Sequence, residues 1–305
     1  MIGAGDVCER KGGPPLYLLE GSDLLAVHRR DQEKGRDFAR RHNDARYCAS
    51  LDELLGVEGI VAAYVATPPQ VHCEQTIAAA RAGKHVLCEK PMAMDTAECR
   101  RMITACAEAN VSLGVAYYRR CYPSIVRVRE LLAEGAIGTV RSMSINNQFP
   151  LSHRLDLVHF FFDRIAAVAF ADGVVRARTV DDVTVEMKAE WGETGVPEQI
   201  EIAGDDGRID VLDLKVGRLR IRSAAGEREE KPGPLRYTHW GIVANFVAHL
   251  NDGAPLACSG EDGLMSTAIM DTVSHVAEDG SWLDIDYENP PPLDADRAAR
   301  LNLLG

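Results

Sequence analysis

The stretch LCEKPMAM at residues 87–94 changes abruptly from apolar residues to two charges and a proline. The apolar run HVLC at residues 85–88 is typical of a buried strand, and two charged residues directly after a buried strand are unexpected. Pro91 keeps Lys90 out of the helical region and holds it extended. The segment therefore directs Glu89 and Lys90 toward something beyond the end of the strand.

Short apolar runs and helical patterns alternate on both sides of this stretch. The apolar runs predict strands at residues 24–27, 60–66, 85–88 and 111–116. Helices are predicted between them, at residues 31–41, after residue 50, up to residue 82 and at residues 95–109, with capping boxes at Ser50 and Asp95. Strands separated by such helices predict right-handed βαβ units and a parallel, doubly wound sheet.

The second half of the chain has a different pattern. After a predicted helix at residues 123–134, strands separated by short turns are predicted at residues 140–149, 180–191, 199–202, 208–212 and 217–221, and helices at 240–250 and 261–276. We therefore predict an α/β Rossmann domain over residues 1–120. An α+β domain over residues 121–305 is expected to carry an open, mainly antiparallel sheet with helices on one face.

The composition is that of an ordinary globular protein, with 305 residues, 46% hydrophobic and 26% charged. The net charge of -12 disfavours nucleic acid and anionic membranes as partners, since both favour clustered Lys and Arg. The N-terminus lacks the pattern of a signal peptide and no apolar run is long enough to span a bilayer, so we expect a cytoplasmic protein.

The eight cysteines include no C-x-x-C pair, so the sequence predicts neither a metal site nor a disulfide framework. Cys99 and Cys106 share a helical stripe with Met102 and Ile103. That spacing is more typical of core packing than of chemistry.

The segment GAGDVC at residues 3–8 contains the G-x-G of the dinucleotide fingerprint, with Cys8 where a third glycine is usual. Only two residues precede it, where a full first strand should lie. A lone G-x-G is equally compatible with a flexible terminus, but the βαβ pattern that follows favours a nucleotide site. We therefore predict that Gly3, Gly5, Asp6 and Val7 bind a cofactor.

Two further segments lie at expected strand ends. An acidic residue after the second strand would bind the ribose 2′-hydroxyl of NAD, whereas arginines accommodate the 2′-phosphate of NADP. Arg29 and Arg30 occupy that place, so we predict NADP(H), with NAD as the alternative; two solvated surface arginines are the other interpretation. Thr67, Pro68 and His72 follow a central strand where ligands of such sheets bind, although His72 taken alone is more typical of a structural histidine at a helix start.

Residues 60–140 resemble the glucose–fructose oxidoreductase/inositol dehydrogenase (Gfo/Idh/MocA) family of NAD(P)-dependent oxidoreductases. The resemblance rests on ATPPQVH (66–72), AGKHVLCEKPMAM (82–94), VAYYRR (115–120) and ELLAEGAIGTV (130–140), and is extended by SHRLDL (152–157) and HWGIVANFVAHLNDGAP (239–255). In this family the E-K-P segment lies beside the nicotinamide. The resemblance therefore implies that Lys90 is a catalytic lysine and Glu89 a supporting, cofactor-binding residue.

The resemblance also implies roles for two residues of the SHRLDL segment. Oxidation of a secondary alcohol requires its hydroxyl proton to leave, so a general acid/base is needed besides the cofactor. The match makes His153 that group, with Asp156 orienting it or binding a substrate hydroxyl. A helical turn separates the two residues and places them on one face. Without the resemblance, a capped helix with an incidental histidine would be the simpler interpretation.

Three features depart from the family pattern. The first strand is cut short, a family strand is absent near residues 191–196, and most of a loop before His153 is missing. Phe149 stands where the family commonly has an aspartate four residues before the histidine. Natural deletions and segments missing from this sequence both explain these departures.

Two functions of different classes follow. One is an NAD(P)-dependent dehydrogenase or reductase acting on CH–OH groups of a sugar, cyclitol or related polyhydroxylated molecule. The other is a redox-silent nucleotide-binding relative that acts as a sensor or interaction module. Lys90 and His153 favour the enzyme. The resemblance also implies a homo-dimer or homo-tetramer formed through the open sheet, for which we expect an exposed apolar sheet face.

Overall fold

The computed structural model describes residues 1–146, 149–188, 197–301 and 303. The chain divides into two compact units. Unit 1 comprises Met1–Tyr118 and Arg236–Thr267, and unit 2 comprises Arg119–Leu235 and Ala268–Gly305. The sequence-based division placed all of residues 121–305 in the second domain, whereas residues 236–267 group with the first unit in the structure.

Unit 1 is built on a parallel sheet. Its strands are β1 (Ala26–His28), β2 (Arg46–Cys48), β3 (Ala62–Val65), β4 (His85–Cys88) and β5 (Leu113–Val115). Ile2 forms parallel bridges with both His28 and Val65 and so joins the pair β1–β2 to the trio β3–β4–β5. With Ile2 in the place of the first strand, the order is that of a doubly wound dinucleotide-binding sheet. The truncated first strand predicted from the sequence is thus a single bridging residue.

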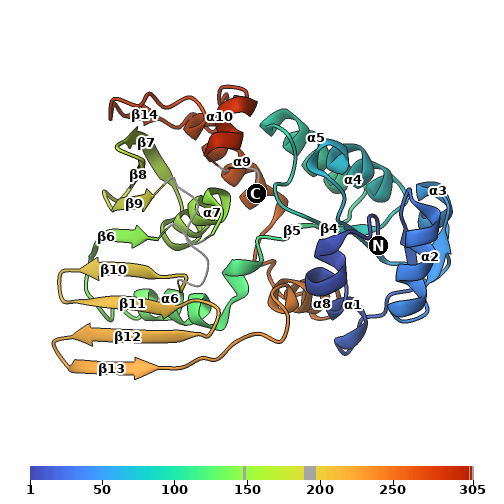
Figure 1. Cartoon of the computed structure of the whole chain (residues 1–305), viewed down its shortest axis with the longest axis horizontal. Coiled ribbons are helices and arrows are strands. Elements are labelled where there is room, and N and C mark those ends of the chain that lie inside the picture. The colour runs from blue at the N-terminus through green and yellow to red at the C-terminus, as the bar shows by residue number, and fades with distance from the viewer. Residues whose placement is uncertain (147–148, 189–196, 302, 304–305) are drawn as a thin grey trace. The chain divides into compact units, whose positions relative to one another are not determined.

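Helices cover both faces of this sheet, as predicted. Figure 1 shows α4 and α5 on one side of β4 and β5, and α1 and α8 on the other. The helices of unit 1 are α1 (Pro15–Leu18), α2 (Gln32–Arg41), α3 (Leu51–Leu55), α4 (His72–Arg81), α5 (Thr96–Glu108) and α8 (Trp240–Asp252), with short turns η1 (Cys8–Gly12) and η2 (Pro69–Val71). The helix α9 (Gly260–Val273) and the short turn η3 (Tyr118–Cys121) each begin in unit 1 and end in unit 2. In the part of the chain that the structure describes, no helix is both long and apolar enough to cross a bilayer.

The predicted helix starts are confirmed by their capping bonds. The side chains of Asp31, Ser50 and Asp95 each accept a hydrogen bond from the backbone three residues on. All eight cysteines lie in the described residues, where no two of them form a disulfide, and Cys99 and Cys106 are buried on α5.

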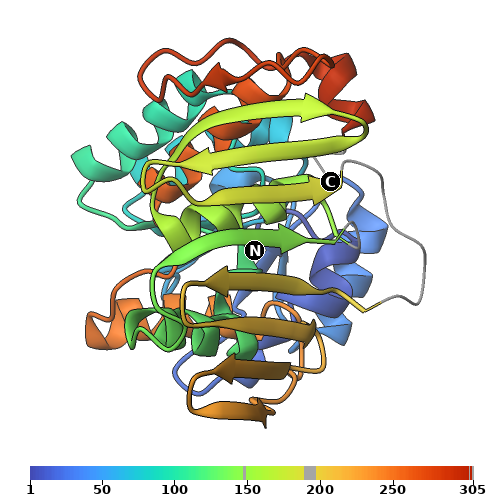
Figure 2. The same ribbon diagram turned by 90° about the vertical axis from the view of Figure 1, so that its left-hand side faces the viewer.

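Unit 2 is a nine-stranded sheet in which β6 and β9 pair in parallel and every other pairing is antiparallel. Helices α6 (Pro123–Ala133) and α7 (Leu151–Phe162) lie behind it in Figure 2, which shows the sheet from its open face. The strands in spatial order are β13 (Gly226–Glu230), β12 (Arg218–Ser223), β11 (Gly207–Asp213), β10 (Ile200–Gly204), β6 (Val140–Ile145), β9 (Thr184–Lys188), β8 (Val174–Thr179), β7 (Ile165–Ala171) and β14 (Leu283–Asp284), and α10 (Ala295–Arg300) follows. The open, mainly antiparallel sheet is confirmed.

The prediction of an apolar open face is wrong. Strand alternation turns Ile202, Ile209 and Ile221 inward, where they are fully buried, and turns charged residues outward. Asp210 lies on the open face under Arg208 and Arg222, both of which donate to its carboxylate. Further ion pairs on this half of the sheet join Arg208 to Glu201, Arg220 to Glu227 and Glu229, and Arg222 to Glu227. The face is polar and covered with opposite charges.

Three strand predictions also need correction. The hairpin of β7 and β8 was missed, although its turn is Asp172-Gly173 with both residues at positive φ, the strongest short hairpin signal. Of the strand predicted at residues 180–191, residues 184–188 form β9; residues 180–183 form the turn before it, and residues 189–191 lie outside the described residues. The strand predicted at residues 140–149 ends at Ile145, and residues 147–148 are not described.

Candidate functional site

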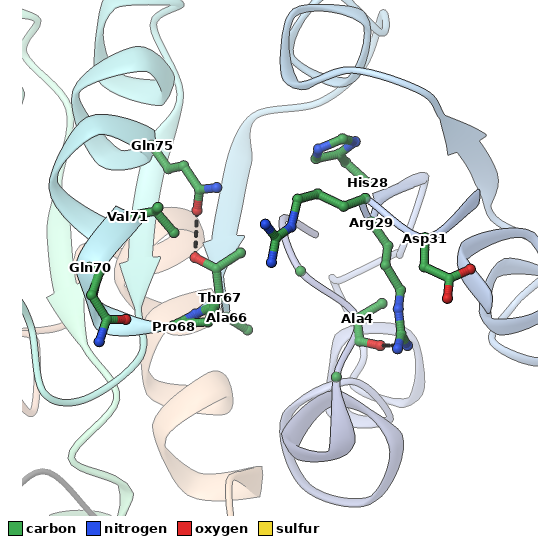
Figure 3. Close-up of a pocket in the computed structure, with 13 residues that line it drawn as sticks. Ala4, His28, Arg29, Asp31, Ala66, Thr67, Pro68, Gln70, Val71 and Gln75 are labelled. Atoms are coloured by element: carbon green, nitrogen blue, oxygen red, sulfur yellow. Dashed lines mark hydrogen bonds between the residues drawn. The ribbon is translucent and has the colours of Figure 1, made fainter. Parts of the chain in front are cut away.

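A pocket of about 820 Å³ opens at the carboxyl ends of Ile2, β1 and β3. This is the point at which the strand order reverses, where ligands of open α/β sheets bind. Figure 3 shows side chains from both sides of the switch point facing this space. The lining residues are Gly3, Ala4, Gly5, His28, Arg29, Arg30, Asp31, Ala66, Thr67, Pro68, Gln70, Val71 and Gln75.

The G-x-G turn forms one wall of the pocket. Gly3 has a φ of +86°, and a Cβ there would lie 2.6 Å from the carbonyl oxygen of Ala66. Only glycine tolerates that combination. Gly5 differs, because a Cβ at this position would meet no protein atom within 4 Å. Glycine at position 5 therefore leaves open space in the pocket that any side chain would fill.

The charged groups of the pocket come from the loop after β1. Arg29 reaches back to donate from Nη1 to the carbonyl oxygen of Ala4 (Figure 3). Asp31, the one carboxylate of the pocket lining, caps α2 by accepting from the backbone N–H of Lys34 at 3.1 Å, and this bond lowers the pKa of Asp31. Among the described residues, Arg30 has neither a hydrogen bond nor an ion pair. The pocket therefore presents a net positive edge at this loop.

The opposite wall comes from the loop after β3. Thr67 donates from Oγ1 to Oε1 of Gln75 at 2.5 Å. His72 is fully buried beneath this wall, with Nε2 at 2.7 Å from the carbonyl oxygen of Thr67 and Nδ1 at 3.0 Å from that of Pro91. His72 thus links the loops after β3 and β4. It does not line the pocket, and its predicted contact with a cofactor stays a prediction.

Glu89, directly after β4, is a buried carboxylate held by several donors. The Tyr64 hydroxyl donates to Oε1 of Glu89, and the Nε2–H of His239 donates to the same oxygen at 2.9 Å. The backbone N–H of Lys90 donates to Oε2 of Glu89 at 3.2 Å. Burial alone raises the pKa of Glu89, but the charge of His239, the hydrogen bonds from His239 and Tyr64 and the charge of Lys90 outweigh it and lower the pKa to about 2. Glu89 is therefore an anion at neutral pH and lies directly before Lys90.

In unit 2, the SHRLDL segment forms the start of α7, so His153 and Asp156 lie one helical turn apart and both are buried. Asp156 has a strong partner that the sequence did not reveal. Arg120 donates from Nε to both carboxylate oxygens at 3.1 Å and from Nη2 to Oδ1 at 2.8 Å. The predicted interaction of Asp156 with His153 or a substrate hydroxyl stays a prediction.

The position at which the family commonly has an aspartate is filled differently. Phe149 is buried, and the guanidinium of Arg119 lies over its ring at 4.3 Å from the centroid. Arg119 also donates to Glu198 at 2.9 Å, and both side chains are buried. A packed cation–aromatic contact thus takes the place of a polar side chain.

The pocket gathers six of the residues predicted to bind the cofactor, namely Gly3, Gly5, Arg29, Arg30, Thr67 and Pro68. Asp6 is exposed and Val7 half-buried in the turn beyond it, and neither lines the pocket, nor do Glu89 and Lys90. Sequence reasoning missed Tyr64 and His239. Tyr64 left a usable signal, because it carries a polar tip in an otherwise apolar buried strand. His239 left none, since 150 residues separate it from Glu89.

Comparison with known proteins places this site in context. The Gfo/Idh/MocA family model, described as an oxidoreductase family with an NAD-binding Rossmann fold, matches residues 1–117. Oxidoreductase P35 of Formosa agariphila is 31% identical over 294 residues, covering 95% of this chain and 85% of its own. The 1,5-anhydro-D-fructose reductase of Ensifer adhaerens is 28% identical over 331 residues, covering 94% and 98%.

The fold agrees with that relationship. An oxidoreductase from Agrobacterium radiobacter, solved in complex with NAD+, L-tartaric acid and magnesium, superimposes with a TM-score of 0.82 at 19% identity over 93% of this chain and 96% of its own. The pocket at the switch point, the E-K-P segment after β4 and the match over nearly the whole chain agree with one another. The chain belongs to the Gfo/Idh/MocA family of NAD(P)-dependent oxidoreductases and is a dehydrogenase or reductase.

Proposed function

We propose that this protein is an NADP(H)-preferring enzyme that moves a hydride between the nicotinamide and a CH–OH or C=O carbon of a sugar, cyclitol or related polyhydroxylated molecule. The observation that carries the proposal is the pocket at the switch point, which presents two arginines while its carboxylate is committed to the start of α2. A relative named 1,5-anhydro-D-fructose reductase supports a sugar-type substrate.

The two arginines have different roles in this proposal. Arg29 is engaged by the carbonyl of Ala4 and braces the G-x-G turn. Arg30 is exposed at the pocket edge and is our candidate for the 2′-phosphate of NADP. Guanidinium groups bind phosphate oxygens with charge-assisted, often bidentate hydrogen bonds, which favours NADPH over NADH.

The residues present fit a dinucleotide. The open space beside Gly5 and the volume of about 820 Å³ suit a nucleotide better than a small ion. The residues expected to hold it are Gly3, Gly5, Asp6, Val7, Thr67, Pro68 and His72, with Glu89 and Lys90 at its reactive end. When bound, the nicotinamide supplies or accepts the hydride.

The protein supplies the accompanying proton transfer. We assign Lys90 and His153 to hold or accept the proton of the substrate oxygen, because both are ionisable groups suited to general acid–base catalysis. Asp156, which is fixed by Arg120, orients His153 or binds a substrate hydroxyl. Glu89 keeps a fixed negative charge beside Lys90.

We also infer a homo-dimer or homo-tetramer formed through the open face of the unit 2 sheet. The alternating charges of that face are self-complementary, since Arg220 and Arg222 lie beside Glu227 and Glu229. Such a surface can pair with a second copy of itself by exchanging partners across the interface.

A redox-silent role is not favoured. Relatives over nearly the whole chain are named as an oxidoreductase and a reductase, and a silent module would have no need for both Lys90 and His153. The fold alone would not separate the two functions.

Single-turnover nicotinamide absorbance with a panel of sugars, keto-sugars and cyclitols tests the proposal. We expect hydride transfer by the wild type and a rate about 10²–10⁴-fold lower in His153→Ala, with NADPH affinity kept within a few-fold because His153 acts on the substrate proton. Lys90→Ala should also be slow and bind NADPH slightly more weakly.

Two results would count against it. A wild-type protein that transfers no hydride to any member of the panel would restore the redox-silent function. A His153→Ala protein as fast as the wild type would show that the proton belongs to another residue.

A further inference from the structure

His239, at the start of α8, contacts the Glu89 carboxylate from a distant part of unit 1. Its Nε2 lies 2.9 Å from Oε1 of Glu89, its Nδ1 lies 3.0 Å from Oγ1 of Thr238, and its side chain is 2% exposed. The ring also packs against Tyr118, with centroids 4.2 Å apart and planes 32° apart. The imidazole is therefore fixed on each of its edges and on one face.

These contacts fix which ring nitrogen of His239 faces the carboxylate. Glu89 is ionised and can only accept, so Nε2 carries the proton and donates to it. On the other side of the ring, Nδ1 is hydrogen-bonded to the Thr238 hydroxyl. The imidazole thus delivers a single N–H to a single carboxylate oxygen, in a geometry set by Thr238 and Tyr118.

The titratable groups that face the carboxylate are His239, Lys90, Tyr64, Cys88 and Cys8, and the charges of His239 and Lys90 both act on it. Burial raises the pKa of Tyr64 and Cys88 well above their usual values and that of Cys8 to about 12, so these three groups are neutral at physiological pH. Tyr118 packs against the ring of His239. The charges of His239 and Lys90 lower the pKa of Glu89, because Coulomb attraction favours the ionised carboxylate.

We infer that His239 is a positioning residue of the hydride-transfer site, which keeps Glu89 ionised and in place so that the carboxylate supports Lys90. The inference rests on the proposed function of Lys90 as a proton-transfer group. His239 acts through Glu89: the carboxylate it fixes also accepts the backbone N–H of Lys90 at 3.2 Å.

Two substitutions distinguish the contribution of the N–H of His239 from that of its ring. His239→Phe keeps a ring against Tyr118 but removes the donor, so burial again raises the pKa of Glu89. As pH falls, this variant should therefore lose activity at a higher pH than the wild type does. His239→Gln places an amide N–H close to the position of Nε2 and should restore the contact. We expect His239→Phe to lower kcat about 10–100-fold and to move the acid limb of the kcat profile up by at least about one pH unit, with the KM for NADPH within about twofold. His239→Gln, which restores the hydrogen bond but not the charge, should keep an acid limb below that of His239→Phe.

The chain offers a matched control in His42. Its Nε2 lies 3.0 Å from Glu9, its Nδ1 lies 3.2 Å from the Tyr17 hydroxyl, and its ring stacks on Phe38. His42→Phe therefore removes the same kind of contact elsewhere in unit 1. It should lower the melting temperature as His239→Phe does and leave the pH profile unchanged.

Additivity gives a second test. The double variant His239→Phe/Glu89→Gln should be no slower than Glu89→Gln alone, because both changes act on one carboxylate. If the effects of the two changes add, or if His239→Phe has the wild-type kcat and acid limb, the inference is overturned. Equal behaviour of His239→Phe and His239→Gln would also overturn it.

Infrared difference spectra provide a test without turnover. The protonated-carboxyl stretch of Glu89, identified by its loss in Glu89→Gln, should appear at higher pH in His239→Phe than in the wild type. An ionised Glu89 at the same pH in both proteins contradicts the inference. A wild type without hydride transfer contradicts the proposed function instead, and the spectra still decide the role of His239.

Discussion

Arg29 and Arg30 are adjacent in sequence, but their surroundings give them different roles. The guanidinium of Arg29 is held at Ala4, whereas that of Arg30 lies exposed at the pocket edge. Because a charge-assisted hydrogen bond contributes roughly 1.5–3 kcal/mol, Arg30→Ala should weaken NADPH binding by about 10–150-fold and leave NADH almost unchanged. Fluorescence titration with both cofactors measures this.

Arg29→Ala is the matched comparison. Loss of the contact to Ala4 loosens the G-x-G turn, so this variant should weaken NADPH and NADH alike. Replacement of both arginines should erase the preference. Equal affinities of the wild type for the two cofactors, or tighter NADH, would remove the argument for NADP.

The Glu89 carboxylate should also affect how the free energy of unfolding depends on pH. Its folded pKa of about 2 lies below the ordinary value of 4.5, so its contribution is fully present above pH 4.5 and is lost as pH falls toward 2. Glu89→Gln should therefore flatten the fall in the free energy of unfolding across that window, as measured by urea denaturation. Glu9→Gln is a control of the same sign, since hydrogen bonds from Arg41 lower the pKa of Glu9 to about 2. An unchanged slope in Glu89→Gln would contradict the contacts described.

Site residues differ in how far the sequence could predict them. Lys90 and Glu89 could be singled out from the local sequence, because charged residues directly after a buried apolar strand are unexpected without a functional role. The partners Tyr64 and His239 depend on tertiary packing, and the hydrogen bond between His239 and Glu89 joins residues 150 positions apart. Arg120 was likewise predicted only as part of a matching segment, and its ion pair with Asp156 depends on how η3 and α7 pack.

At the level of elements, the cap of α5 fixes the exit of the E-K-P loop. Asp95 accepts the backbone N–H of Glu98 at 2.7 Å, and Glu98 returns a carboxylate to the N–H of Met94 at 3.1 Å. Asp95→Ala should lower the free energy of unfolding by about 1 kcal/mol, whereas Asp95→Ser, which still caps, should lose less. Equilibrium urea unfolding compares the variants. An alanine variant as stable as the wild type would mean that α5 is held by packing alone.

The sequence predicted elements best where local chemistry decides them. The caps at Ser50 and Asp95, the helix starting at Asp31 and the strand at residues 85–88 were located correctly because hydrogen bonding and apolar runs are local. The β7–β8 hairpin was missed despite its Asp172-Gly173 turn, since its small alanines hid the strand pattern. The open sheet face was misjudged because its arginines and glutamates were not assigned to one side.

For the whole molecule, the charged open face makes the expected assembly sensitive to salt. An interface formed by Arg220, Arg222, Glu227 and Glu229 should weaken as ionic strength rises, unlike an apolar one. Light scattering at micromolar concentration should show a dimer or tetramer that dissociates toward the monomer in high salt, and Arg220→Glu should favour the monomer at low salt. A strict monomer at low salt would contradict assembly through this face.

The division of the chain shows what sequence order conceals. A change of pattern after residue 120 located the start of the second unit within two residues of Arg119. The return of residues 236–267 to the first unit could not be predicted from pattern, because helix α8 has the same periodicity whichever unit it packs on. That return is what brings His239 to Glu89.

The most direct measurement follows an isotope. NADPH carrying deuterium at the transferable position of the nicotinamide is incubated with keto-sugars and keto-cyclitols, and the products are examined by mass spectrometry. We expect one deuterium on the carbon that gains the hydroxyl, and far less product with His153→Ala. Product without deuterium, or no product from any substrate with the wild-type protein, would contradict hydride transfer as the function of this chain.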